Sequence, residues 1–215
     1  MTNQTGSMNL LVIGATGGVG LQVVRQALAK GHQVTALSRS ALSLPLQHPG
    51  LRKVAGSFHD ADLLQTVIPG HDAVIITASL GIFELKKQPD FYTRGTGLVI
   101  RAMQQHGVPR LVILSNLAAG DGHALLNPLE RLFTYLFIRE ATADHTRQEQ
   151  LARDSGLQWT VARPTRLTNG PARGRYRAVS GQKVPASISR ADVADFLLES
   201  APTGRWLNRI LNLGG

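Results

Sequence analysis

The hydrophobic residues of this chain fall into short continuous runs that alternate with longer segments in which apolar and polar positions are interleaved. The short runs have the length of buried strands and stop at glycine, proline or polar residues. They predict strands at residues 9–13, 33–37, 51–55, 73–77, 110–114, 158–162 and 210–213. In the longer segments apolar residues recur every three or four positions, as on one face of a helix. These segments predict helices at residues 21–29, 62–68, 91–106, 141–154 and 193–200.

The alternation of strands and helices constrains the topology. A strand that is followed by a helix and then by another strand forms a crossover connection, which makes the sheet parallel and places helices on both of its faces. We therefore predict a single-domain α/β protein with a doubly wound parallel sheet over residues 8–215. Residues 1–7 are predicted to form a disordered N-terminal extension.

Two segments interrupt this alternation. Residues 121–139 are rich in leucine and aromatic residues, and a short helix is expected to begin near Pro128. Residues 163–190 are rich in proline, glycine and arginine and are predicted to be irregular, with one short strand near residues 176–179. Both segments are candidates for covering a binding site, because loops carried on a rigid sheet are where binding residues concentrate.

Composition excludes several classes of protein. The chain has 215 residues, of which 43% are hydrophobic, and it contains no cysteine. The length suffices for a core without covalent staples, and the lack of cysteine excludes disulfide scaffolds, zinc ribbons, iron–sulfur clusters and thiol nucleophiles; we expect no metal site. No run approaches the roughly 18 apolar residues of a membrane span, and residues 1–9 lack the apolar stretch of a signal peptide. We expect a soluble, cytoplasmic protein whose formal net charge of +9 favours an anionic partner.

A glycine-rich turn connects the first predicted strand to the first predicted helix. Gly14, Gly17 and Gly20 stand three residues apart in the sequence GATGGVG. Such a turn lets the chain leave the strand sharply, lets the backbone approach a pyrophosphate and lets the helix pack close to the sheet, while the helix N-terminus supplies N–H donors. The position between a strand and a helix is the one that a dinucleotide-binding motif requires. We therefore predict a Rossmann fold with a dinucleotide bound at this loop.

The end of the second strand indicates which dinucleotide is bound. Proteins that bind NAD usually place an acidic residue there, which accepts a hydrogen bond from the ribose 2′-hydroxyl. Here the strand ends in Ser38 and Arg39, with no carboxylate. A guanidinium group pairs well with a 2′-phosphate, so NADP(H) is favoured over NAD(H). The alternative is that Arg39 is only a solvated surface charge.

The spacing of the glycines resembles the G-x-x-G-x-x-G motif of the short-chain dehydrogenase/reductase superfamily, in particular its extended and atypical branches. Further along, the sequences DHTR (144–147), SGL (155–157) and RP (163–164) follow one another in the order helix, turn, strand. This order resembles the atypical branch that contains the biliverdin-IXβ/flavin reductases and the regulatory NmrA-like proteins, and the Asp-His pair most resembles the reductases. A strand that ends in Ser115 also matches, and the resemblance covers nearly the whole chain from Met8.

The resemblance implies positions for the site residues. Ser115 and His145 would flank the nicotinamide and the substrate as catalytic residues, and Thr16 would contact the cofactor phosphates. The residues expected around the cofactor are Gly14, Thr16, Gly17, Gly18, Val19, Gly20, Ser38, Arg39, Ala78, Ser79 and Pro164. Two alternatives stay open: His145 is also compatible with a helix-surface histidine of no function, and Ser115 with a hydroxyl that satisfies a strand end.

Most enzymes of this superfamily use a Tyr-x-x-x-Lys pair to exchange a proton with a substrate carbonyl. The tyrosines here are Tyr92, Tyr135 and Tyr176, and none has a lysine four residues later. The reductases that the chain resembles mainly hold a hydride donor against a planar, electron-poor acceptor, and solvent or the acceptor supplies the proton. The missing pair therefore fits reduction of a flavin or a linear tetrapyrrole.

We predict an NADPH-dependent oxidoreductase that transfers a hydride to a planar acceptor, namely a flavin, a biliverdin-like tetrapyrrole or a quinone. The alternative is a non-catalytic NADP(H)-binding regulator or redox sensor of the NmrA-like type, which the missing tyrosine and the apolar 121–139 segment also fit. A sugar-nucleotide or isoprenoid-modifying enzyme is disfavoured, because such enzymes need the tyrosine. The expected partner is a small-molecule acceptor, with no specific nucleic acid and no membrane, and the expected state is a monomer or a homodimer.

The two irregular segments carry side chains whose role stays open. Phe133, Tyr135 and Phe137 fit stacking on a planar ligand, burial in the core or contact with a second subunit. Residues 155–191 contain no acidic residue, and their basic residues are Arg163, Arg166, Arg173, Arg175, Arg177, Lys183 and Arg190. They fit a cationic rim for the phosphate or propionate groups of an anionic substrate, nonspecific attraction to nucleic acid, or a solvated basic surface.

Overall fold

The structure, a computed structural model, describes residues 6–85, 87–202 and 204–215. Of the predicted extension at residues 1–7, residues 1–5 lie outside the described part of the chain. The Ser7 hydroxyl donates a hydrogen bond to the Gly31 carbonyl oxygen at 2.8 Å, so the described chain is already tied to the body of the protein one residue before Met8.

The elements agree closely with the predicted pattern. The strands are β1 (Asn9–Ile13), β2 (Gln33–Ser38), β3 (Leu51–Ala55), β4 (Ala73–Ile76), β5 (Arg110–Leu114), β6 (Gln158–Pro164), β7 (Arg166–Thr168), β8 (Arg177–Val179), β9 (Ser187–Ser189) and β10 (Arg209–Gly214). The α-helices are α1 (Gly18–Ala29), α2 (Ala61–Val67), α3 (Ile82–Leu85), α4 (Phe91–Gln105), α5 (Pro128–Phe133), α6 (Arg139–Asp154) and α7 (Arg190–Glu199). Shorter turns of helix are η1 (Ala41–Ser43), η2 (Gly120–Leu125) and the π-helix η3 (Thr134–Ile138).

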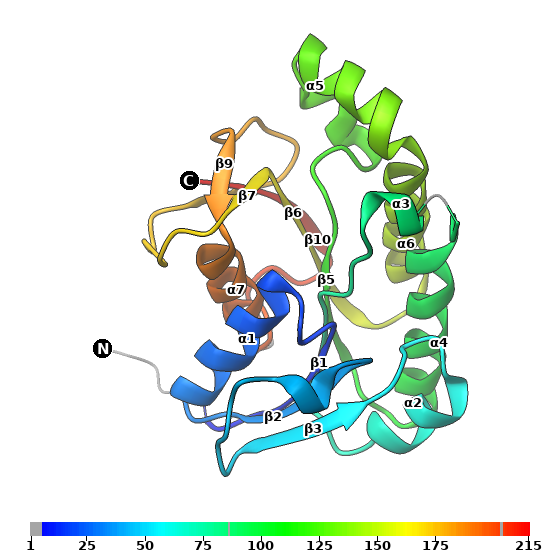
Figure 1. Cartoon of the computed structure of the whole chain (residues 1–215), viewed down its shortest axis with the longest axis vertical. Coiled ribbons are helices and arrows are strands. Elements are labelled where there is room, and N and C mark those ends of the chain that lie inside the picture. Colours follow the sequence, from blue (N-terminus) through cyan, green and yellow to red (C-terminus); the bar gives the residue numbers. More distant parts are fainter. Residues whose placement is uncertain (1–5, 86, 203) are drawn as a thin grey trace.

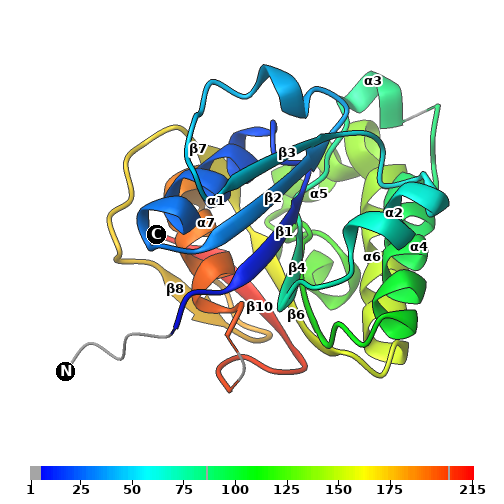
Figure 2. The ribbon, with the colours of Figure 1, turned by 90° about the horizontal axis from the view of Figure 1, so that it is seen from below.

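The main sheet has eight strands in the order β3-β2-β1-β4-β5-β6-β10-β8. Its strand pairs are parallel except for the edge strand β8, which runs antiparallel to β10. Helices α1 and α7 cover one face, and α2, α4 and α6 cover the other (Figures 1 and 2). The predicted doubly wound Rossmann architecture is therefore confirmed. Because the chain winds outward from β1 in both directions, β1 and β4 form the switch point where such sheets bind ligands.

The alternation of side chains along β1 explains why the sheet has a core on each face. Leu10 and Val12 pack under α1 and α7, whereas Leu11 and Ile13 pack under α2 and α4, and all four are at most 1% exposed. A strand that is buried on both faces has a continuous apolar sequence rather than an alternating one, which is the pattern from which β1 was predicted. None of the helices in the described part of the chain is long and apolar enough to cross a bilayer.

The irregular segments contain more structure than predicted. The segment 163–190 was predicted to hold one strand; it holds β7, β8 and β9, and β7 pairs with β9 in a small separate sheet. The short helix expected from Pro128 is present as α5, which begins with a capping box formed by Asn127 and Glu130. In Figure 1, α5 and the β7–β9 pair stand on opposite sides of the upper end of the molecule.

Helix α1 lies unusually close to the sheet, and Gly20 makes this possible. A Cβ atom at Gly20 would lie 2.2 Å from the Gly14 carbonyl oxygen and 2.6 Å from Thr77 Oγ1. The first turn of the helix therefore rests on the backbone of the strand ends, as expected for the third glycine of the motif.

Two helical glycines with different surroundings test this account of the packing. In Gly20→Ala the methyl group meets fixed backbone, so we expect the free energy of unfolding to fall by about 1–3 kcal/mol. In Gly97→Ala, within α4, the nearest atom is Leu151 Cδ1 at an ordinary 3.7 Å, and the helix preference of alanine should add about 0.5–1 kcal/mol. Urea unfolding measures both changes, and a Gly20→Ala protein as stable as the wild type would contradict the close approach.

Candidate active site

Two adjoining cavities lie at the carboxyl ends of the central strands. One, of about 240 Å³, is lined by Arg39 and is called here the Arg39 lobe. The other, of about 210 Å³, is lined by His145 and is called the His145 lobe. Gly17, Ala78 and Ser79 line both, so the two lobes form one elongated cleft across the switch point.

The glycine loop forms the floor of this cleft. Gly14 has a φ of +83°, and a Cβ atom there would lie 2.5 Å from the Ala78 amide nitrogen. Gly17 caps α1 without a side-chain hydrogen bond, and the first turn of the helix has no acidic residue. The first amides of α1 are consequently free of capping side chains and carry the positive end of the helix dipole. Backbone and helix together provide the cradle that a pyrophosphate requires.

The Arg39 lobe contains several polar side chains, of which Ser38 and Arg39 lack a strong partner within the described part of the chain. Ser38 Oγ is buried and has no hydrogen-bond partner within the described part of the chain. Ser40 Oγ donates to Thr16 Oγ1 at 3.2 Å at the mouth of the lobe. Arg39 forms no ion pair with a described carboxylate. These groups fit the ribose and 2′-phosphate of NADP(H), because a buried polar atom is normally satisfied by some partner.

The charged side chains that line the cleft are all positive. Neither lobe is lined by a described carboxylate, while Arg39 lies in one and Arg190 in the other. Arg190, the first residue of α7, donates to Asn169 Oδ1 at 2.6 Å, and a Cβ atom at Gly18 would lie 2.7 Å from its Nε. A guanidinium group thus adjoins the phosphate loop at Gly18, in the lobe that does not contain Arg39. Such a site favours a ligand with several negative charges.

Ser115 lies at the end of β5 in the His145 lobe, but its hydroxyl hydrogen is already engaged. Ser115 Oγ donates to Glu149 Oε1 at 2.6 Å, and both side chains are buried. Glu149 in turn forms a two-point ion pair with Arg163, with Nε–Oε1 and Nη2–Oε2 distances of 2.9 and 2.6 Å. The oxygen lone pairs of Ser115, rather than its proton, are therefore available to the cleft.

Arg163 differs from its sequence-based interpretation. It was grouped with the basic residues of a surface rim, yet its side chain is only 2% exposed. Besides Glu149 it binds Asp121, with an Nη1–Oδ1 distance of 2.6 Å, and this contact holds the pKa of Asp121 below its ordinary value. Arg163 is therefore a structural cation. The exposed members of the basic segment are Arg166, Arg173, Arg175, Arg177 and Lys183.

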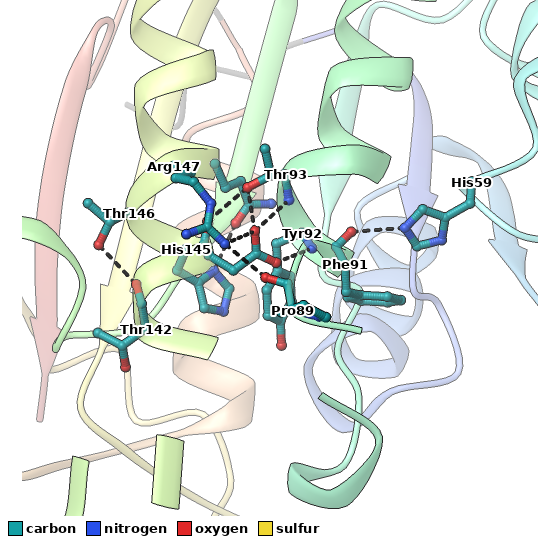
Figure 3. A network of polar contacts seen from close by, with 11 residues as sticks. His59, Pro89, Phe91, Tyr92, Thr93, Thr142, His145, Thr146 and Arg147 are labelled. Atoms are coloured by element: carbon teal, nitrogen blue, oxygen red, sulfur yellow. Dashed lines mark hydrogen bonds and ion pairs between the residues drawn. The ribbon is translucent and has the colours of Figure 1, made fainter. Parts of the chain in front are cut away.

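His145 is buried, so the alternative that it lies on the surface of its helix is wrong. Its ring stacks on Tyr92, with centroids 3.7 Å apart and planes inclined by 23° (Figure 3). His145 Nδ1 lies 2.8 Å from Gln148 Oε1, and Gln148 Nε2 donates to Thr96 Oγ1. Because the amide oxygen only accepts, Nδ1 carries the hydrogen and Nε2 keeps its lone pair. Burial lowers the pKa of His145, which favours this neutral form.

The neighbouring Asp144 fixes the stack by capping α4 from another helix. Its carboxylate accepts from the backbone N–H groups of Tyr92 and Thr93, at 2.6 and 3.2 Å. The cap residue of α4 itself, Asp90, makes no such side-chain bond. Arg147 pairs with Asp144 at 3.3 Å and donates to the Pro89 carbonyl oxygen (Figure 3). The DHTR sequence thus joins α6 to the start of α4.

The predicted site residues converge with one exception. Gly14, Thr16, Gly17, Ser38, Arg39, Ala78 and Ser79 line the Arg39 lobe, and Gly17, Gly18, Val19, Ala78, Ser79, Ser115, His145 and Pro164 line the His145 lobe. Gly20 lines neither and acts through packing.

Sequence inspection did not place Tyr92 in the site and named Arg190 only as one member of a basic segment, yet both line the His145 lobe. Each stands in the first turn of a helix at this edge of the sheet. That position is the signal that could have identified both, because parallel α/β proteins bind ligands at the carboxyl edge.

Helices α5 and η3 present a large apolar surface to solvent. Its exposed side chains, with their exposed fractions, are Leu129 76%, Leu132 53%, Phe133 50%, Tyr135 64%, Leu136 54% and Phe137 49%. The interpretation of Phe133, Tyr135 and Phe137 as core residues is therefore wrong. Apolar side chains grouped in this way usually mark a binding surface.

Comparison with known proteins places the chain in a family. The model of a family described as NAD(P)H-binding matches residues 14–203. Photosystem II assembly factor Ycf39 of Synechocystis is 36% identical over 53% of this chain and 35% of its own length. The (4-alkanoyl-5-oxo-2,5-dihydrofuran-3-yl)methyl phosphate reductase of Streptomyces griseus is 30% identical over 86% of this chain and 60% of its own. The chain thus spans about a third of the first relative and about three fifths of the second.

Solved structures share the fold over nearly the whole chain. The anaerobilin reductase ChuY of Escherichia coli O157:H7 has a TM-score of 0.79 and 24% identity, covering 95% of this chain and 96% of its own. A short-chain dehydrogenase/reductase of Veillonella parvula in complex with NADP has a TM-score of 0.82 and 15% identity, covering 98% and 95%. The predicted nicotinamide cofactor is confirmed at the level of the family. The chain belongs to the NAD(P)H-binding family, and its fold is the one shared by these solved structures.

Proposed function

We propose that this protein is an NADPH-dependent reductase that transfers a hydride to a planar acceptor, namely a flavin, a biliverdin-like tetrapyrrole or a quinone. The observation that carries the proposal is the cleft itself. It combines a phosphate cradle and two arginines that form no ion pair with a described carboxylate with a second lobe that has a stacked aromatic pair but neither the Tyr-x-x-x-Lys pair nor any described carboxylate. Such a site orients two planar rings and lacks the usual machinery for carbonyl proton exchange.

The cofactor would lie across both lobes. Arg39, Ser38 and Thr16 would hold the 2′-phosphate and ribose, and the amides at the start of α1 would hold the pyrophosphate. Ser115 and Pro164 would then border the nicotinamide in the His145 lobe. When bound, NADPH supplies the hydride, and the protein supplies orientation and exclusion of water.

The acceptor would occupy the outer part of the His145 lobe, under the segments 121–139 and 163–190. Support comes from the position of these segments on either side of the same end of the molecule (Figure 1), and from Leu167 and Arg190, which belong to the second segment and line the lobe. Arg190 and the exposed arginines beyond it favour an acceptor with phosphate or carboxylate groups. Relatives named as reductases and a neighbour named as an anaerobilin reductase support the same class of reaction.

A second candidate function is a non-catalytic NADP(H)-dependent regulator that binds a protein partner. The exposed apolar surface at residues 129–137 favours it, because grouped leucines and aromatic residues are typical of protein interfaces. One relative is named as an assembly factor, which fits this class. The two candidates differ in whether any acceptor is reduced.

Acceptor-dependent oxidation of NADPH tests the proposed reaction. Purified protein is mixed with NADPH and, in turn, FMN, biliverdin and menadione, and absorbance at 340 nm is followed. We expect turnover with at least one acceptor and little without any. A protein that binds NADP⁺ but oxidises NADPH with none of these acceptors would support the regulator instead.

The choice of cofactor is tested at Arg39. Arg39→Asp replaces the proposed partner of the 2′-phosphate by a group that repels it, and loss of a charged hydrogen bond corresponds to an affinity change of about 10- to 100-fold. We expect the Kd for NADPH to rise by at least that factor and the Kd for NADH to change far less, as measured by quenching of protein fluorescence. Arg177→Asp alters an exposed arginine at the sheet edge and is the control. Equal losses for both cofactors would remove Arg39 as the discriminator.

A further inference from the structure

Hydride transfer to a conjugated acceptor places negative charge on a carbonyl oxygen or ring nitrogen of that acceptor. An enzyme stabilises this charge with hydrogen-bond donors positioned where it develops. In the proposed reaction the His145 lobe must provide such a donor, and the absence of the Tyr-x-x-x-Lys pair leaves open which group it is.

The predicted catalytic residues are not suited to this task. The Ser115 hydroxyl donates to Glu149, and His145 turns its N–H group toward Gln148 and keeps a lone pair at Nε2. Thr77, which also lines the lobe, donates its hydroxyl hydrogen to the Ile13 carbonyl oxygen at 2.9 Å. Toward the cleft these three residues therefore offer acceptors rather than donors.

Tyr92 has the required properties. Its side chain lines the lobe, is 4% exposed and is held in position by the His145 ring and by the bond from its backbone N–H to Asp144. Its hydroxyl points away from the amides that Asp144 binds (Figure 3). Burial raises the pKa of Tyr92 to about 12, against an opposing hydrogen bond with the Leu80 backbone, so the phenol keeps its proton at neutral pH.

We propose that Tyr92, on α4, is the hydrogen-bond donor to the acceptor. This inference rests on the proposed function. The acceptor gains two electrons and one proton as a hydride from the cofactor, which is oxidised, and it takes a second proton from water. The Tyr92 O–H bond is not broken; the phenol stabilises the charge that develops during transfer.

Tyr92→Phe tests the role of the hydroxyl and keeps the stacked ring. Removal of one such donor typically lowers kcat by about 10²–10³-fold, and we expect a loss in this range with the best acceptor at saturating NADPH. The Kd for NADP⁺ should stay within about twofold. Tyr176→Phe is the matched control, because it removes another partly buried phenol hydroxyl, bonded to Asp195 at 3.2 Å and lining neither lobe. An unchanged kcat in Tyr92→Phe, or a loss of kcat in Tyr176→Phe equal to that in Tyr92→Phe, would overturn the inference. The proposed reductase activity would be unaffected by either result.

A binding measurement separates this inference from the reaction itself. FMN, biliverdin and menadione are titrated into wild-type protein and into both tyrosine variants in the presence of NADP⁺, with fluorescence as the readout. Loss of one neutral hydrogen bond should weaken binding about 2- to 10-fold in Tyr92→Phe and not in Tyr176→Phe. If the wild-type protein oxidises NADPH with no acceptor but Tyr92→Phe alone binds an acceptor more weakly, the proposed reductase activity is contradicted and the role of Tyr92 as a hydrogen-bond donor is supported. Equal affinities in such a protein, or binding of none of the compounds, would overturn the Tyr92 inference as well.

Discussion

The buried ion pair between Glu149 and Arg163 is the interaction on which the geometry of the cleft depends. It joins α6 to β6, and through the Ser115 hydroxyl it joins both to the end of β5. Each charge would be costly to bury alone, and removal of one partner from such a pair typically destabilises a protein by about 3–5 kcal/mol. The pair therefore sets the distance between the helix that carries His145 and the strand that carries Ser115.

The surroundings of this pair explain features that otherwise look unrelated. Gly120 has a φ of +54°, and a Cβ atom there would lie 2.7 Å from Arg163 Nη2, so glycine is favoured where the chain that leaves β5 passes the guanidinium group. Asp121, the next residue, forms a second ion pair with Arg163. The same contact anchors the beginning of the segment that continues into α5. The exposed apolar surface is therefore connected through Asp121 to the Glu149–Arg163 ion pair.

Much of the fold could be predicted because the relevant signals are local. The continuous apolar run at residues 9–13 and the glycines that follow it specify a buried strand, a tight turn and a helix within a few residues. The roles of Arg163 and Tyr92 could not be predicted in this way. Burial of Arg163 depends on Glu149 and Asp121, which are 14 and 42 residues away in sequence, and composition around Arg163 suggested only a basic surface. Tyr92 was assessed for a lysine partner on its own helix, whereas its partner in space is His145.

The small β7–β9 pair was missed for a similar reason. Three-residue strands are too short to show a periodicity, and β7 pairs with a strand about 20 residues away in sequence, Leu167 with Ile188 for example. Tertiary structure also determines that Phe133 and Phe137 are exposed. Hydrophobicity alone does not distinguish a side chain that is buried in the core from one on a binding surface.

No described carboxylate lines the cleft, and this has a consequence for the protein before any ligand is bound. Arg39, Arg190 and the start of α1 direct positive potential into one shared space, and with nothing bound these groups repel one another. A polyanion relieves that repulsion in addition to forming its own contacts, so ligand binding and resistance to unfolding are thermodynamically linked in this molecule.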